Sequence, residues 1–173
     1  IDAIRRSRPA AHENTQATYE ALFAPADAGD FPIAQRLAIA SFVIALHGET
    51  PLLEVYTEPL DPALAALVAG QAAQAIRPGP FGVYREPGLA AESVEGARFE
   101  ASTDDLGEKL AAALTHAALL VQRPREASPQ ALEALLNSGW SRQAVVTLSQ
   151  LVAFLTFQVR IVAGLAVLKE SQL

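Results

Sequence analysis

The sequence predicts an all-α protein of one domain, and three observations support this fold class. The chain has 173 residues, an ordinary length for one domain, and 51% of them are hydrophobic, which is enough for a sizeable core. Ala and Leu dominate, whereas aromatic residues make up only 6%. Ala and Leu lose little freedom on entering a helix and β-branched residues lose more. Apolar residues also recur at helical spacing along most of the chain.

In the first half of the chain, helices are expected over residues 11–23, 32–47, 51–57 and 61–76. The second of these has the strongest signals. Asp30 supplies a capping side chain, Pro32 suits a first helical turn, and Gly48 follows the last turn. Its apolar residues cover most of its surface, so this helix is expected to be buried on most sides.

Regular structure is expected to stop between Arg77 and Thr103, where Pro and Gly cluster. An irregular segment of this length is uncommon inside a compact domain, and is usually functional or disordered. Short extended pieces fit residues 83–85 and 98–100, without forming a sheet. Further helices are then expected over residues 104–121, 128–137 and 141–168, the last two capped by Ser128 and Ser141.

The last predicted helix raises the question of a membrane span, because residues 151–168 are almost continuously apolar. Arg160 stands near its centre, where a charge is costly in a bilayer, and Thr156 and Gln158 add to that cost. No basic cluster or aromatic belt flanks the segment. We therefore expect no membrane span, and a helix buried in the core, in a subunit interface, or in both.

Composition also excludes several classes of function. The net charge is −6 and no basic stripe is present, so no nucleic-acid partner is expected. The chain has no cysteine, which removes disulfides, thiolate nucleophiles and Cys-ligated metals. This is compatible with a reducing compartment, and we expect a cytoplasmic protein. The three histidines form no paired ligand motif and no Gly-rich phosphate loop occurs, so neither a metal nor a cofactor is expected.

Two segments resemble a known family. Ser138-Gly139-Trp140-Ser141, followed by the Phe-rich residues 151–160 that end in Val159-Arg160, resembles the C-terminal part of the carboxymuconolactone decarboxylase family, especially its AhpD-like, peroxidase-related branch. Residues 35–48, ending in Leu46-His47-Gly48, look like the helix that leads into the active site of that family. The resemblance implies that residues 1–173 form one AhpD-like antiparallel helical bundle, assembled as a dimer or a trimer-based homo-oligomer.

The same resemblance argues against the thiol-peroxidase activity of the family. Its peroxidase members carry a Glu, a Cys-x-x-Cys and a His, and the positions that match them here are Leu37, Glu49, Leu52 and Tyr56. A thiol peroxidase needs a thiolate to attack and a second thiol to resolve the sulfenic acid. The chain has neither, so it is expected to be non-peroxidatic.

Residues around this vestigial site remain candidates for another chemistry. Arg36 and His47 are eleven residues apart on one predicted helix face, and Glu49, Glu54 and Tyr56 follow just beyond the helix end. A histidine beside a carboxylate can act in acid–base catalysis near neutral pH. In the simpler interpretation, which we favour, His47 only caps the C-terminus of its helix.

Two more residues are singled out by their surroundings. Arg160 is expected to be buried and paired with a carboxylate such as Glu54 or Glu133, and in the enzyme hypothesis either Arg36 or Arg160 would hold a carboxylate substrate. His116 is expected to be a packed histidine with one hydrogen bond.

Three functions follow from these observations. The first is a non-peroxidatic family member that binds a small molecule or a partner. The second is an enzyme: an acid–base catalyst of the decarboxylase or lactone type that uses His47, Glu49, Glu54 and Tyr56, or a peroxidase-related oxidoreductase that acts with a partner. The third is a purely structural interaction protein.

Overall fold

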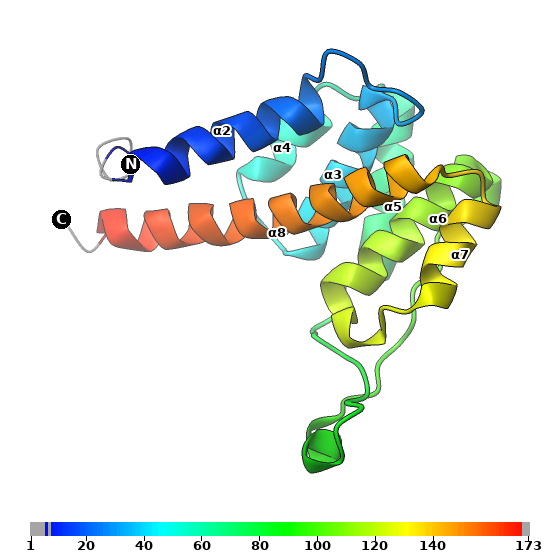
Figure 1. The fold of residues 1–173 in the computed structure, drawn as a ribbon. Helices are drawn as coiled ribbons and strands as arrows, with labels where there is room; N and C mark the ends of the chain where they lie inside the picture. Colours follow the sequence, from blue (N-terminus) through cyan, green and yellow to red (C-terminus); the bar gives the residue numbers. More distant parts are fainter. Residues whose placement is uncertain (1–5, 7, 171–173) are drawn as a thin grey trace.

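The computed structural model describes residue 6 and residues 8–170, and this part of the chain is helical with no β-strand. The prediction of an all-α fold is therefore confirmed (Figure 1). The elements are α2 (Pro9–Phe23), α3 (Ile33–Leu46), α4 (Leu52–Thr57), α5 (Pro62–Ala75), the 3-10 turn η1 (Pro87–Glu92), α6 (Thr103–Gln122), the 3-10 turn η2 (Pro124–Glu126), α7 (Pro129–Asn137) and α8 (Arg142–Glu170).

Helix α3 lies at the centre and packs against α4, α5, α6 and α8. Nine of its fourteen residues are buried, as its nearly all-round apolar sequence predicts. The buried faces of α5 and α6 are rich in alanine, whose small side chain lets neighbouring helices approach closely. The indole of Trp140 closes one end of this core, because its Nε1 donates a hydrogen bond to the Lys109 carbonyl and its ring packs edge-on against Phe31.

Two of the three predicted N-terminal helix caps are present, at Ser128 and Ser141. Each accepts a hydrogen bond from a backbone N–H group in the first turn of the following helix, and Asp61 caps α5 in the same way. The prediction for Asp30 was wrong: α3 starts after Pro32 without a side-chain cap. The Asp30 carboxyl instead interacts with Ser141 at the start of α8, and the hydrogen bond from Ser141 lowers the pKa of Asp30.

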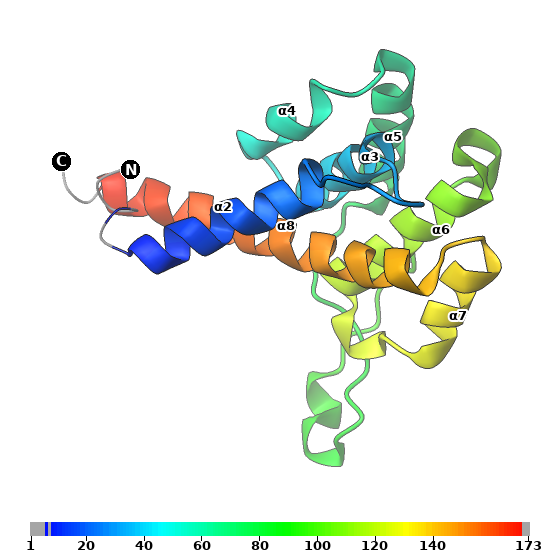
Figure 2. The ribbon, with the colours of Figure 1, turned by 45° about the horizontal axis from the view of Figure 1, so that its top comes forward.

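The expected irregular segment, 77–103, leaves the body and returns, with η1 at its far end (Figures 1 and 2). A single bridge between Gly82 and Val94 joins its two limbs. Arg123 holds its base, because the guanidinium donates to the Gly96 carbonyl and to both carboxylate oxygens of Glu126. The segment is thus fastened to the end of α6.

Helix α8 is the longest element, with 29 residues and a length of about 43 Å. Its first half, 142–155, crosses the body, whereas its second half continues beyond the body beside α2 (Figures 1 and 2). We call α2 together with residues 156–170 of α8 the helical arm. The two helices of the arm run antiparallel.

Candidate functional site

The end of α3 brings together residues from two elements. His47 is the C-cap of α3, as its simpler interpretation predicts, and its Nε2 lies 3.3 Å from Thr156 Oγ1 on α8. Burial lowers the pKa of His47, and the nearby positive charge of Arg160 lowers it further. The imidazole is therefore held in its neutral form, which can accept a proton.

Tyr56 of α4 also contacts α8. The side chain is buried in the core, its ring packs 5.0 Å from the Phe23 ring, and its hydroxyl donates a 2.5 Å hydrogen bond to Gln158 Oε1. Burial raises the pKa of Tyr56, so the phenol stays protonated at neutral pH. Tyr56 thus acts as a packed hydrogen-bond donor between α4 and α8.

The two glutamates of the predicted site lie apart from this cluster. Glu49 and Glu54 are both exposed. Glu54 lines a groove of about 730 Å³ formed by α3, α4 and α5, and His47 is not among the residues that line that groove. Among the described residues, no hydrogen bond or ion pair joins a carboxylate to His47, so His47, Glu49 and Glu54 are not assembled into one acid–base set.

Arg160 is exposed, so the prediction that it is buried was wrong. The ion pairs among the described residues join Arg98 and Arg123 to Glu126, and none involves Arg160, Glu54 or Glu133. The neighbouring Thr156 and Gln158 contact His47 and Tyr56 of the body, and Val159 packs against the core, whereas Arg160 lies on the exposed part of the helix. Arg160 therefore contributes its charge to the surface next to His47.

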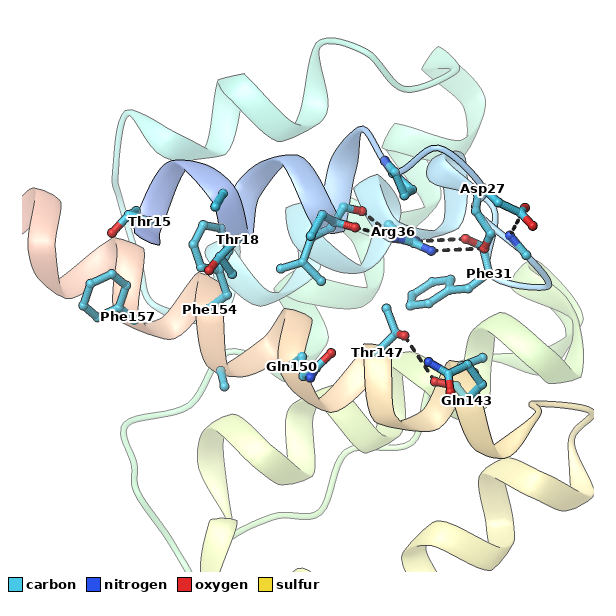
Figure 3. A pocket seen from close by; sticks show the side chains of 18 of the residues that line it. Thr15, Thr18, Asp27, Phe31, Arg36, Gln143, Thr147, Gln150, Phe154 and Phe157 are labelled. Carbon is cyan, nitrogen blue, oxygen red and sulfur yellow. Dashed lines mark hydrogen bonds between the residues drawn. The ribbon is translucent and has the colours of Figure 1, made fainter. Parts of the chain in front are cut away.

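Arg36 is buried and is one of the residues that line the groove between α2 and α8, but backbone carbonyl oxygens accept the hydrogen bonds of its guanidinium. It donates to the carbonyl oxygens of Phe31 at 2.9 Å, Leu22 at 2.7 Å and Ala28 at 3.1 Å (Figure 3). These bonds fasten the end of α2 to the α2–α3 connection. Arg36 and His47 share a helix but lie about 16 Å apart along it, at opposite ends.

Most of the positions at which the resemblance would place the peroxidase residues are part of the apolar packing. Leu37 and Leu52 are half-buried and pack against the core. Together with Tyr56, they occupy three of the four positions where the resemblance places the peroxidase machinery. The region around the end of α3 therefore consists mainly of packed apolar side chains, with polar contacts to α8 through His47 and Tyr56.

A large groove lies elsewhere, between α2 and α8 (Figure 3). This groove has a volume of about 1180 Å³. On α2 it is lined mainly by small side chains, and on α8 by Gln150, Ala153, Phe154 and Phe157. The groove was not predicted from the sequence, although the spacing of Ala11, Asn14, Thr18 and Ala21 places four small residues on one helical face.

Comparison with known proteins adds no relative: no family model, curated protein or solved structure matches the chain. The resemblance to the AhpD-like branch stays a prediction from the motifs.

Proposed function

We propose that this chain is a non-peroxidatic, protein-binding member of the AhpD-like branch, and that its helical arm pairs with the arm of a second copy. The observation that carries this proposal is an apolar stripe on α8 that the chain itself leaves uncovered. In this assembly two antiparallel helix pairs would form a four-helix bundle.

The α8 stripe consists of Val146, Gln150, Ala153, Phe157, Ile161 and Gly164. All six residues are exposed, including Phe157 at 44% and Ile161 at 43%. They recur at intervals of three or four residues, so they lie on one face of the helix. This spacing is typical of a helix that packs along another helix.

The arm offers both halves of a self-complementary contact. Phe157 projects beside the groove between α2 and α8, and small residues such as Ala11, Ala17 and Ala153 line that groove (Figure 3). A twofold axis would place Phe157 of each chain in the groove of the other. The charged residues that line the groove, Asp27, Asp30 and Arg36, all lie near its base, so pairing would bury little charge along the arm.

The stripe and the adjoining face of α2 give a contact face of moderate size. The stripe spans residues 146–164 of α8, about 28 Å, α2 is about 22 Å long, and each helix is about 10 Å wide. Side by side they present about 500 Å² in projection, which is below the roughly 800 Å² per partner of a standard interface.

A bilayer fits the arm less well than a second chain does. Helix α8 is long and apolar enough to cross a membrane, with a mean hydropathy of 2.1 over its most apolar window. However, its first half packs into the body, and residues 156–170 extend only about 22 Å, less than the roughly 30 Å of a hydrocarbon core. The neighbouring α2 also exposes Glu13 and Glu20.

The test is the mass of the purified protein in solution, measured by light scattering and sedimentation at micromolar concentration. We expect a dimer for the unchanged protein and a monomer for Phe157→Asp, because a carboxylate would be buried without a partner. Val83→Asp is the matched control: Val83 is 52% exposed in the segment 77–103, which extends away from the arm (Figure 1), and its variant should remain dimeric.

Three outcomes would contradict the proposed dimer. One is a monomeric unchanged protein, and another is a Phe157→Asp protein that is still dimeric. The third is flotation of the unchanged protein with neutral lipid vesicles, which would assign the stripe to a membrane. Peroxide turnover above the no-protein rate with a dithiol donor would contradict the non-peroxidatic part.

An acid–base reaction at the end of α3 is the second candidate function. The contact between His47 and Thr156 beside Arg160 favours it, because a neutral imidazole can take a proton while the guanidinium holds a carboxylate. Lactone opening or CO2 release by the unchanged protein should then be lost in His47→Gln and kept in His12→Gln, since His12 is exposed on α2. Equal activity of both variants would rule it out.

A further inference from the structure

A second cavity lies apart from the arm groove, between α6, α7 and the chain segment that leads into α6. Its volume is about 550 Å³, within the range of about 300–1,000 Å³ that small-molecule pockets occupy. Alanines make up much of its wall: Ala101, Ala111, Ala112, Ala118, Ala131 and Ala134. A wall of this kind leaves room for a flat apolar group.

His116 of α6 lines this cavity and has an unused hydrogen-bonding atom. The side chain is only 5% exposed, and its Nε2 is buried without a hydrogen-bond partner. Leaving such an atom unpaired costs about 1–3 kcal/mol, so most buried polar atoms have a partner. The expected packed histidine is therefore present, but Nε2 lacks a partner.

The neighbouring polar side chains are already engaged. Thr115 Oγ1 accepts from the Ala101 N–H, Gln122 Nε2 donates to the Ala75 carbonyl, and Ser138 Oγ donates to the Leu135 carbonyl. His116 Nε2 is consequently a buried polar atom of this wall that has capacity left for a ligand.

The charges around the cavity favour an uncharged ligand. Arg98 and Arg123 are both paired with Glu126. Glu100 and Glu108 also line the cavity, where they would repel an anion. Burial lowers the pKa of His116, so the imidazole is neutral and offers no cation either.

We propose that this cavity binds an uncharged aromatic alcohol of the phenol class, whose ring lies against the alanine wall and whose hydroxyl pairs with His116 Nε2. A hydroxyl can both donate and accept, so it matches either tautomer of a neutral imidazole. Because Nε2 is closed to solvent, the hydroxyl reaches it after a small rotation of the imidazole toward the cavity. The ligand then relieves an unpaired polar atom, which an apolar compound of the same shape cannot do.

The test compares phenol with toluene, which has the same ring but no hydroxyl. Titration of the full chain is followed by long-range ¹H–¹⁵N spectra of the histidine nitrogens and by calorimetry. We expect phenol to bind at least tenfold more tightly than toluene and to shift Nε2 of His116 but not the nitrogens of His12. Equal binding of the two compounds, or no saturable binding of phenol, would overturn the proposal.

Variants of the histidine and of the cavity wall, each with a matched control, extend the test. His116→Leu should reduce phenol binding to the level of toluene, and His12→Leu should leave it unchanged. If His116→Leu does not fold, Ala112→Leu serves instead, because it fills the cavity and keeps the histidine. Its matched control is Ala66→Leu on the exposed face of α5. Phenol binding that survives Ala112→Leu would place the ligand elsewhere and contradict the proposal.

This inference does not depend on the proposed dimer. The cavity shares no lining residue with the groove between α2 and α8. Phe157→Asp should therefore leave phenol binding unchanged, whatever it does to assembly.

Discussion

The two halves of α8 have similar apolar sequences and opposite environments. Residues 142–155 contribute seven buried side chains: Ala144, Val145, Leu148, Leu151, Val152, Phe154 and Leu155. Residues 156–170 contribute none, although they include Phe157, Ile161 and Val167. The first half meets α3, α6 and α7 in the body, and the second half has α2 alongside it (Figure 2).

This difference shows that the apolarity of a helix does not determine whether the chain itself covers it. Only 22% of the most apolar window of α8 is buried within the protein. An exposed apolar stripe of this length marks an interaction surface, since monomers rarely leave one uncovered. The inner half of α8 therefore stabilises the fold, and the outer half is expected to act in assembly.

The sharpest test of this contrast is one truncation in each half. Leu151→Ala removes a fully buried side chain and should lower the free energy of unfolding by about 2–5 kcal/mol. Ile161→Ala, on the exposed stripe, should cost no more than about 0.5 kcal/mol. Urea unfolding at protein concentrations low enough to keep the chain monomeric measures both. Similar losses in the two variants would refute the division of α8.

The attachment of the arm can be broken at its base. Arg36→Met leaves the carbonyl oxygens of Leu22 and Phe31 without their donor and should cost about 2–3 kcal/mol. Hydrogen exchange in α2 should also become faster. Arg160→Met is the control, because this exposed side chain makes no ion pair among the described residues and should change stability by less than about 0.5 kcal/mol. Unchanged protection of α2 in Arg36→Met would count against the anchoring role.

Lowering the pH should loosen the junction between the two halves. His47, against Thr156, and His116 both have pKa values below the ordinary 6.5, mainly because they are buried. The unfolded chain thus binds protons more readily than the folded one, and the stability from these histidines is full above pH 6.5 and is lost as the pH falls through their folded pKa values. The free energy of unfolding should be lower at pH 5.5 than at pH 7.5, and the difference should shrink in His47→Gln. A flat profile would contradict burial of both rings.

The smallest expected effect concerns Gly164 in the outer half of α8. It is exposed in a helix interior, and a Cβ added there meets nothing within 4 Å. Gly164→Ala should therefore stabilise the monomer by about 0.5–1 kcal/mol, measured by thermal unfolding. In the proposed dimer the same methyl group would lie in the interface. A gain in monomer stability together with weaker dimerisation would locate Gly164 at a close helix contact.

Local signals predicted much of the fold. Helices α5, α7 and α8 begin directly after Asp61, Ser128 and Ser141, because a cap acts within one helical turn of its own residue. The expectation that His47 caps α3 rests on the same kind of short-range argument. The cap at Asp30 was wrong because its carboxyl found a partner at the start of α8, more than a hundred residues away.

The candidate site was harder to predict than the fold. The sequence indicated that His47 and Tyr56 lie near the end of one helix, but not that Thr156 and Gln158 would contact them from α8. It also gave no sign that the donors of Arg36 would be used by backbone carbonyls. Such contacts depend on how far one helix extends past another, which no local pattern records.

The amino-acid sequence by itself determined the helical class, most helix boundaries and the absence of thiol chemistry, since these depend on residue type and short-range spacing. Only the tertiary structure decided which apolar faces are covered, which polar atoms are left without partners, and where the hollows lie. Burial is set by the elements that meet in space: the body covers much of the first half of α8, whereas in the second half it contacts Thr156, Gln158 and Val159 and leaves Phe157 and Arg160 exposed.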